Sequence, residues 1–259
     1  MLPKDDLLKG IDNRDSAARI IDQAEQAIKT WDIIFTDFLA PPELFEAQQM
    51  FSRLTEVHIA AGGGYPQAER KRLAIARSEL PLDASQVTVA VLDIAGNFLF
   101  DPATHRDFLG AILGTGIVRE KVGDIIVLGE RGAQVVVVPD LVEFLEMNVT
   151  QVRSVPVKTR HIDVSELKVR EPRKKEMTTV EASLRLDAIA SAGFGMSRSK
   201  MADLISSGDV RVNWKDITQA SHSLKSGDLV AIRGKGRLEI GEIATTKKGR
   251  YRVDLVRFM

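Results

Sequence analysis

Residues 86–158 constrain the fold most, because their hydrophobic spacing alternates between two kinds. Short runs rich in branched residues predict strands, namely "QVTVAVLDI" (86–94), "DIIVLG" (124–129) and "AQVVVVP" (133–139). Helical spacing of apolar residues predicts helices at "THRDFLGAIL" (104–113), where Thr104 suits an N-cap, and at "DLVEFLEMN" (140–148). "VTQVRSVPVKTR" (149–160) predicts a last strand. The expected order is therefore βαββαβ.

This order is the ferredoxin-like arrangement, which RNA-recognition domains share. The third strand of an RNA-recognition domain usually carries aromatic side chains that stack on bases. The third strand expected here, "AQVVVVP", contains no aromatic residue. The sequence therefore predicts the topology without its usual base-stacking chemistry.

The preceding residues predict an N-terminal α/β domain that is mostly helical. "RDSAARIIDQAEQAIKTW" (14–31) and "PELFEAQQMF" (42–51) predict helices, and "EVHIA" (56–60) predicts a short strand. "AGGGYP" (61–66) predicts a tight turn that leads into a helix at 67–79. The cations of that helix form either a solvated face or a second RNA-contacting surface; they are Arg70, Lys71, Arg72 and Arg77.

We expect an α+β multidomain chain. Its parts are an N-terminal domain at 1–82, a βαββαβ domain at 83–160, a charged linker at 161–179 and a last domain at 180–259. Within the last domain the spacing predicts helices at 181–193 and 197–208 and strands at 209–214 and 226–234. The tail from residue 236 predicts two strands joined at "KKG", which is a β-hairpin.

The net charge of zero hides a difference between the two ends of the chain. Residues 1–155 carry 15 Lys and Arg against 23 Asp and Glu, and residues 156–259 carry 21 against 13. The balance is −8 in the first part and +8 in the second. This asymmetry indicates a polyanion-binding C-terminal part, and a chance segregation of solvated charges is the alternative.

Several classes of site and location are not expected. The chain has no cysteine, and its four histidines show no ligand spacing, so we expect no disulfide, metal or cofactor. The N-terminus is charged and lacks an apolar core, so we expect no signal peptide. No run of 18 apolar residues occurs, so we expect no membrane span. Together with the lack of cysteine and of a signal peptide, this indicates a soluble protein of a reducing compartment.

Residues 181–240 resemble the small RNA-binding domain named after ribosomal protein S-four. The matching motifs are "RLD" (185–187), "SRSKMADLISSGDVRVN" (197–213) and "LKSGDLVAI" (224–232). In that family two helices and the following loop form a basic face for structured RNA. Carried over by position, the resemblance implies that the RNA-binding residues are Arg185, Ser197, Arg198, Lys200, Asn213, Trp214 and Lys215.

Arg198 and Lys200 have a physical reason to bind phosphate. Both lie in the first turn of the expected helix, where the positive end of the helix dipole makes cations slightly unfavourable. Free backbone N–H groups and two cations together make a phosphate-binding corner, which offsets this cost when an anion binds.

Each candidate also has a purely structural interpretation. Arg185 can pair with an acid, Ser197 can cap the helix and Asn213 can shape the turn. The two lysines can be solvated. Trp214, where the family usually has glycine, stacks on a base or packs under the hairpin.

Two further motifs, "GGGYPQAERKR" (62–72) and "HRDFLGAILGTGIVREKVGDI" (105–125), resemble signatures of the YlmH family. The most similar branch comprises the photosystem II S-four domain proteins of cyanobacteria and plastids. The resemblance implies binding to the large ribosomal subunit (rRNA or peptidyl-tRNA) in ribosome quality control. It also implies a cytoplasmic location, or the plastid stroma for a plastid member. One basic face needs no dimer, so we expect a monomer.

Two motifs resemble those of enzymes, but each lacks residues that the enzyme motif requires. "HRDFLGAIL" lacks the kinase asparagine, since Ile112 stands there, and "AAGGGYP" is neither a P-loop nor a dinucleotide loop. Arg106 and Asp107 are then either a structural pair or a ribosome-facing pair. We expect no catalytic residue and a non-catalytic RNA-binding protein. The alternatives are an RNA-modifying enzyme with an unrecognised site in residues 1–155, or a photosystem assembly factor that acts through protein contacts.

Overall fold

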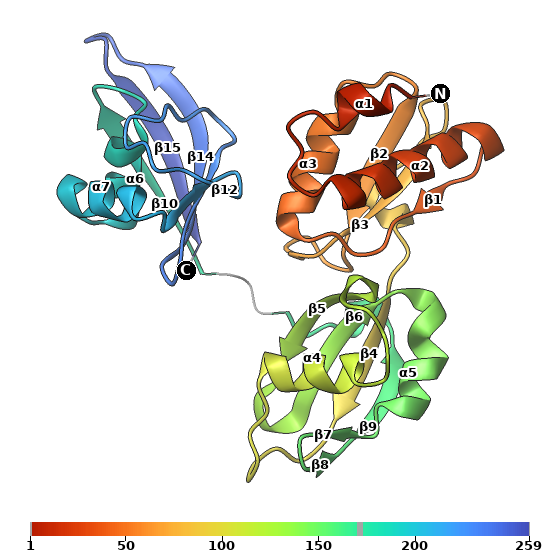
Figure 1. The fold of residues 1–259 in the computed structure, drawn as a ribbon. Helices are drawn as coiled ribbons and strands as arrows, with labels where there is room; N and C mark the ends of the chain where they lie inside the picture. Colours follow the sequence, from red (N-terminus) through yellow and green to blue (C-terminus); the bar gives the residue numbers. More distant parts are fainter. Residues whose placement is uncertain (1, 170–172, 259) are drawn as a thin grey trace. The chain divides into compact units, whose positions relative to one another are not determined.

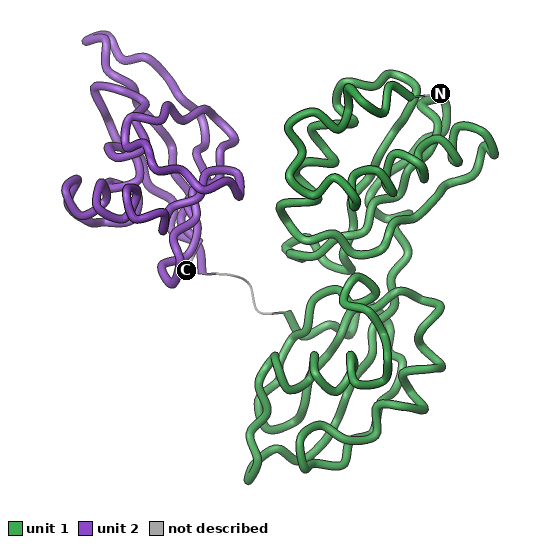
Figure 2. The backbone as a smooth tube through the Cα atoms, in the orientation of Figure 1, with its two compact units in different colours: residues 1–169 green, residues 170–259 purple. Residues whose placement is uncertain are grey.

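The structure is a computed structural model that describes residues 2–169 and 173–258. It divides into two compact units, residues 1–169 and residues 170–259 (Figure 2). Both units combine helices with antiparallel sheets, so the expected α+β multidomain class is confirmed.

The N-terminal part of the first unit packs helices on a small sheet (Figure 1). The helices are α1 (Lys4–Leu7), α2 (Arg14–Thr30) and α3 (Pro41–Phe51), as expected for the last two. The antiparallel sheet has the order β1 (Ile34–Phe35), β3 (Arg72–Arg77), β2 (Val57–Gly62). Apolar side chains of α2 and β3, such as Ile21 and Ile75, meet in the core between them.

The helix expected at residues 67–79 is wrong. Residues 72–77 form β3, the central strand, which pairs with β1 on one side and β2 on the other. Residues 73–76 are fully buried, so this strand has an almost continuous apolar run instead of an alternating one. Its alanine, leucine and arginine favour helices locally, and pairing on both edges overrides that preference.

The middle part of the first unit has the expected βαββαβ order. Its elements are β4 (Ala90–Ala95), α4 (His105–Leu113), β5 (Val122–Val127), β6 (Gly132–Val137), α5 (Val142–Asn148) and β9 (Lys158–Ile162). The sheet order is β5-β6-β4-β9, and every neighbouring pair is antiparallel. Insertion of β6 between β4 and β5 is the split-βαβ arrangement.

Short elements complete the first unit. A two-stranded hairpin precedes β9 and consists of β7 (Gln151–Val152) and β8 (Val155–Pro156). Single 3-10 turns connect the larger elements: η1 (Ala84–Gln86), η2 (Arg119–Lys121), η3 (Gly129–Arg131), η4 (Pro139–Leu141) and η5 (Val164–Glu166).

The second unit is a six-stranded antiparallel sheet with two helices, α6 (Leu186–Phe194) and α7 (Arg198–Ser206). The strands are β10 (Lys174–Glu181), β11 (Val210–Val212), β12 (Lys215–Asp216), β13 (Leu229–Ile232), β14 (Gly236–Thr245) and β15 (Tyr251–Phe258), in the spatial order β10-β15-β14-β13-β11-β12. Both helices lie on the same side of the sheet (Figure 1). Their apolar residues form one core with alternate residues of the strands, such as Val210 and Leu238.

The charged segment expected as a linker contains a strand. Residues 174–181 form β10, which pairs with β15 along its whole length, from Lys174 opposite Phe258 to Glu181 opposite Tyr251. This strand lies at the edge of the sheet and most of its side chains are exposed, so its sequence shows no apolar alternation. Backbone hydrogen bonds hold it, and these leave no pattern in the sequence. Part of the expected linker, residues 170–172, lies outside the described residues.

Candidate nucleic-acid interface

The start of α7 is built as the sequence predicts. Ser197 is the N-cap, and its Oγ accepts a hydrogen bond from the backbone N–H of Lys200 at 3.3 Å. No acidic residue lies in the first turn, and Arg198 and Lys200 are both exposed there. This helix end therefore carries two cations where the helix dipole opposes them.

A buried carboxylate lies opposite Arg198 and explains its placement. Asp187, on α6, is 5% exposed and accepts hydrogen bonds from two guanidinium groups. Nε and Nη2 of Arg185 donate to its two oxygens at 3.0 and 3.1 Å, and the same atoms of Arg198 donate at 3.0 and 3.2 Å. Burial acts to raise the pKa of Asp187, but the hydrogen bonds from both arginines outweigh it and hold the pKa below its usual value.

Both arginines keep donors for an external ligand. Their side chains are 40% (Arg185) and 56% (Arg198) exposed, and each donates to Asp187 through Nε and Nη2. Among the described residues, neither Nη1 has a hydrogen-bond partner. Lys200 lies in the same first turn of α7 as Arg198, so this region has three cations and one anion. Arginines fixed in this way present the planar donor geometry that phosphate oxygens accept.

Asn213 and Trp214 form the two-residue loop of the β11–β12 hairpin. Val212 pairs with Lys215, and both loop residues have positive φ, +49° for Asn213 and +70° for Trp214. Two positive φ values in a two-residue hairpin are typical of a type I′ turn. The Asn213 amide is used inside the domain, because Oδ1 accepts from Leu229 N–H at 2.9 Å and Nδ2 donates to Asp228 at 2.8 Å. The structural role considered for Asn213 is therefore present.

Trp214 contacts a different surface from the α7 corner, which we define as Arg185, Ser197, Arg198 and Lys200. The Arg237 guanidinium lies over its ring, 5.2 Å from the centroid, on the sheet face opposite the helices. A positive φ costs a bulky residue about 1–2 kcal/mol relative to glycine. An exposed cation–π contact returns about 0.5–1 kcal/mol. Lys215 is exposed on β12. The structure thus brings Arg185 and Arg198 together at Asp187, with Ser197 and Lys200 in the adjoining start of α7, and places Trp214 with Arg237.

In the first unit, the two motifs that resemble YlmH signatures meet at Asp124. Its carboxylate accepts hydrogen bonds from the Tyr65 hydroxyl and the Glu69 N–H, both at 2.7 Å, and from the Arg70 N–H at 3.1 Å. Burial and the hydrogen bond to Asp124 raise the pKa of Tyr65 well above its usual value. The glycines before Tyr65 form the expected tight turn, since Gly64 has φ +88° and a Cβ on Gly63 would lie 2.5 Å from the Arg70 carbonyl.

Arginine side chains from both motifs add hydrogen bonds near Asp124. We call this contact between the N-terminal and middle parts of the first unit the joint. Arg70 donates from Nε to the Val122 carbonyl at 3.1 Å and from Nη2 to the Phe38 carbonyl at 2.8 Å. Arg119 donates to the carbonyls of Val122 and Gly123. Burial, with the nearby charge of Arg70, lowers the pKa of Arg119 to about 10. These residues join the N-terminal and middle parts of the first unit. The sequence contains the two motifs, but nothing in it indicates that they contact each other.

The basic helix face expected from residues 70–77 does not exist. Arg72 is buried, donates from Nε to the Thr36 carbonyl at 2.7 Å and also donates to Thr88. Arg77 pairs with Glu79 at 3.1 Å and lies over the Trp31 ring at 3.8 Å. With Arg70 in the joint, these three arginines hold the fold together instead of facing a ligand.

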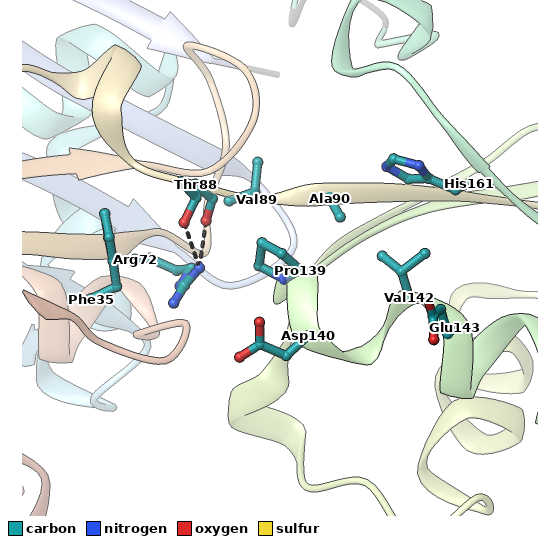
Figure 3. Close-up of a pocket in the computed structure, with 10 residues that line it drawn as sticks. All are labelled: Phe35, Arg72, Thr88, Val89, Ala90, Pro139, Asp140, Val142, Glu143 and His161. Carbon is teal, nitrogen blue, oxygen red and sulfur yellow. Dashed lines mark hydrogen bonds between the residues drawn. The ribbon is translucent and has the colours of Figure 1, made fainter.

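A cavity of about 840 Å³ in the first unit lies beside Arg72 (Figure 3). Its charged and titratable lining groups are Arg72 and His161 on one hand and Asp140 and Glu143 on the other. The Arg72 guanidinium points to Thr88 within this lining (Figure 3). The mixed charge gives no preference for a polyanion, so this cavity is a weaker candidate than the α7 corner.

Asp107 has a structural role at the start of α4. Its Oδ2 accepts from the Thr104 N–H at 2.8 Å and from the Thr104 hydroxyl at 2.7 Å, which closes a capping box. These bonds lower the pKa of Asp107. Arg106 is exposed beside it. The structural alternative for the pair therefore holds for Asp107.

The described residues contain neither a cluster suited to a metal ion nor a helix suited to a membrane. Within residues 2–169 and 173–258, no group of three or more His, Cys, Asp or Glu side chains is placed to hold a metal ion. In the same ranges, no helix has the length and apolar character needed to cross a membrane.

Comparison with known proteins gives matches along most of the chain. Residues 12–80 match the family model "YlmH, N-terminal", residues 83–166 match "Putative RNA-binding domain in YlmH", and residues 184–230 match "S4 domain". The Bacillus subtilis (strain 168) protein named "Ribosome-associated protein quality control protein P2" is 34% identical over 226 residues, which is 86% of each chain.

A solved structure also resembles this fold. The "Cell division protein ylmH from Streptococcus pneumoniae" aligns with a TM-score of 0.54 at 18% identity, over 62% of this chain and 96% of that one. At this identity the likeness concerns the fold alone.

Proposed function

Because this chain belongs to the YlmH family, we propose that it is a non-catalytic RNA-binding protein that binds the large ribosomal subunit. The contact is made by the α7 corner (Arg185, Ser197, Arg198 and Lys200). The ribosome-associated name of the Bacillus relative and the two RNA-binding domain models support this proposal.

One observation carries the proposal: Asp187 clamps Arg185 and Arg198 side by side at an exposed helix start. A single carboxylate cannot neutralise two guanidinium groups, so the cluster keeps a positive charge and its orientation is fixed. The α7 N-terminus adds unpaired backbone N–H groups and the positive end of the helix dipole. An RNA backbone supplies phosphates at a spacing that such a surface can engage in more than one place.

The RNA on the large subunit is either rRNA or peptidyl-tRNA, and a ribosome-bound role corresponds to the cytoplasm or the plastid stroma. Phosphate contacts carry no base information, so the corner provides affinity and orientation instead of sequence selectivity. A binding role requires no catalytic group. The groups at the α7 corner are cations, a hydroxyl and one ion-paired carboxylate.

The test is binding of purified large ribosomal subunits over a salt series. The wild-type protein is compared with the Arg198→Glu, Lys200→Glu double variant. We expect log affinity of the wild type to fall with log salt by roughly 0.7–0.9 per phosphate contact. The variant should bind roughly 10- to 100-fold more weakly and with a shallower slope, because it loses about two such contacts.

The matched control is the Lys247→Glu, Lys248→Glu variant, which makes the same change in net charge at the exposed β14–β15 turn. If it binds as weakly as the corner variant, the effect comes from overall charge and the corner has no special role. Wild-type affinity in the corner variant would contradict the proposal directly.

A further inference from the structure

The sheet face opposite α6 and α7 carries two arginines in one row of paired residues, on either side of an alanine. Arg211 on β11 pairs in register with Ala231 on β13, which pairs with Arg237 on β14. The residues on either side of this row, such as Val210 and Leu238, point into the helix-covered core. Because side chains alternate along a strand, the row faces away from the helices.

A cleft of about 590 Å³ lies over this row. Its lining has three arginines, one tryptophan and one carboxylate, contributed by Arg211, Arg233, Arg237, Trp214 and Asp209. Arg211 pairs with Asp216 at 2.7 Å, and its side chain is 57% exposed. Arg233 is exposed and forms no ion pair with any residue that the structure describes. The Asp209 carboxylate accepts a hydrogen bond from the Ser207 hydroxyl at 2.9 Å. The charge is thus positive, and the volume suits a nucleotide-sized ligand.

Trp214 is the feature that gives this cleft chemical specificity. It occupies a hairpin position with φ +70°, where glycine would be less strained and would close the same turn. The Arg237 guanidinium lies over its ring, 5.2 Å from the centroid, and this contact favours one orientation of the ring. Strain at a side chain that the turn does not need points to a function for that side chain. An aromatic ring beside arginines is the arrangement by which proteins bind unpaired nucleotides.

We propose that this cleft binds one unpaired nucleotide of single-stranded RNA. Trp214 stacks on the base, and Arg233 and Arg237 contact the flanking phosphates. The inference rests on the proposed RNA-binding function and adds a second contact, on the opposite face of the same sheet. An acidic peptide would use the arginines and leave the tryptophan without a role, so RNA is the occupant that accounts for both.

The experiment uses the full chain and a single tryptophan reporter. Trp31→Phe leaves Trp214 as the sole tryptophan, since the chain has two. The probe is an unlabelled single-stranded RNA of about ten nucleotides and mixed sequence. This length spans one single-strand site. We expect the RNA to quench Trp214 emission at saturation. Polyglutamate of similar charge should quench weakly, because it offers no base to stack.

Variants then separate stacking from folding. Trp214→Gly should bind the oligonucleotide about 5- to 100-fold more weakly, while its melting temperature stays equal to that of the wild type or rises. Trp214→Phe keeps a ring and should retain most of the affinity. Unchanged oligonucleotide affinity in Trp214→Gly, or equal quenching by polyglutamate, overturns the inference.

The two proposals fail separately. If large subunits bind through the α7 corner and Trp214→Gly binds the oligonucleotide as well as the wild type, only the cleft is refuted. If the oligonucleotide quenches Trp214 but large subunits do not bind, the cleft stands and the ribosomal function is refuted.

Discussion

Three arginines of the first unit and the two arginines at the start of α7 and α6 in the second unit have different kinds of partner. Each unit contains 18 Lys and Arg, but residues 1–169 contain 25 Asp and Glu and residues 170–259 contain 11. In the first unit, Arg70, Arg72 and Arg119 donate to backbone carbonyls and are largely removed from solvent. In the second, Arg185 and Arg198 donate to a carboxylate and stay half exposed.

The difference shows that the number of cations does not identify an RNA-binding surface. A guanidinium that satisfies buried carbonyls is a structural cross-link, and its burial lowers its pKa, as for Arg72. A guanidinium that is oriented by a carboxylate at the surface retains free donors. The partner of each arginine, which only the folded chain reveals, decides its role.

The largest effect that would sharpen this comparison is at Arg72. Arg72→Ala leaves the Thr36 and Thr88 carbonyls without their donor inside the protein, so we expect a loss of about 3 kcal/mol in the stability of the first unit. Urea unfolding followed by Trp31 fluorescence measures it in a Trp214→Phe background. The adjacent Lys71→Ala is the control and should cost under about 1 kcal/mol. A loss of RNA affinity in folded Arg72→Ala would break the comparison.

A smaller effect is expected at the joint. Asp124→Asn replaces the carboxylate that accepts three hydrogen bonds with a neutral amide. We expect a loss of about 1–2 kcal/mol in the stability of the first unit. The same substitution should bring the pKa of Tyr65 back towards its ordinary value, because one cause of its elevation is gone. Ultraviolet titration in a Tyr251→Phe background, where Tyr65 is the sole tyrosine, would show it. An unaltered Tyr65 titration would mean that burial alone sets its pKa.

The smallest effect concerns pH and Asp187. Its folded-state pKa is lowered from 3.8, so its contribution to stability is complete above that pH and is lost as the pH falls through the folded value. Asp187→Asn should therefore destabilise the second unit by about 1 kcal/mol at neutral pH, and by progressively less below about pH 3.8. Amide hydrogen exchange in α6 and α7 of the full chain measures both. A difference that stays constant down to pH 2 would show that the charge of Asp187 is not what matters.

Local periodicity predicted most elements, and it failed where pairing decides the structure. Residues 104–113 and 197–208 carry their own caps and apolar stripes, so both helices were predictable. β3 is central and buried on both faces, and β10 is an exposed edge; neither shows the alternation that identifies a strand. Both exist because of neighbouring strands that are distant in the sequence.

The candidate site shows the same division. Arg198 and Lys200 stand out because a helix start is an unfavourable place for cations, and the N-cap role of Ser197 follows from its position. The carboxylate opposite them is inside the quoted "RLD" motif, yet only the packing of α6 on α7 brings Asp187 to Arg198, eleven residues later. Whether these residues contact RNA stays a prediction.

The Asp187 clamp has a consequence for the entropy of binding. Two long side chains have given up much of their rotational freedom in the unbound protein, so little of that loss remains to oppose association. The guanidinium groups of Arg185 and Arg198 are therefore held at one fixed spacing. This spacing favours a ligand whose phosphates are already fixed in position by a folded backbone, and it gives less affinity for a flexible polyanion of equal charge.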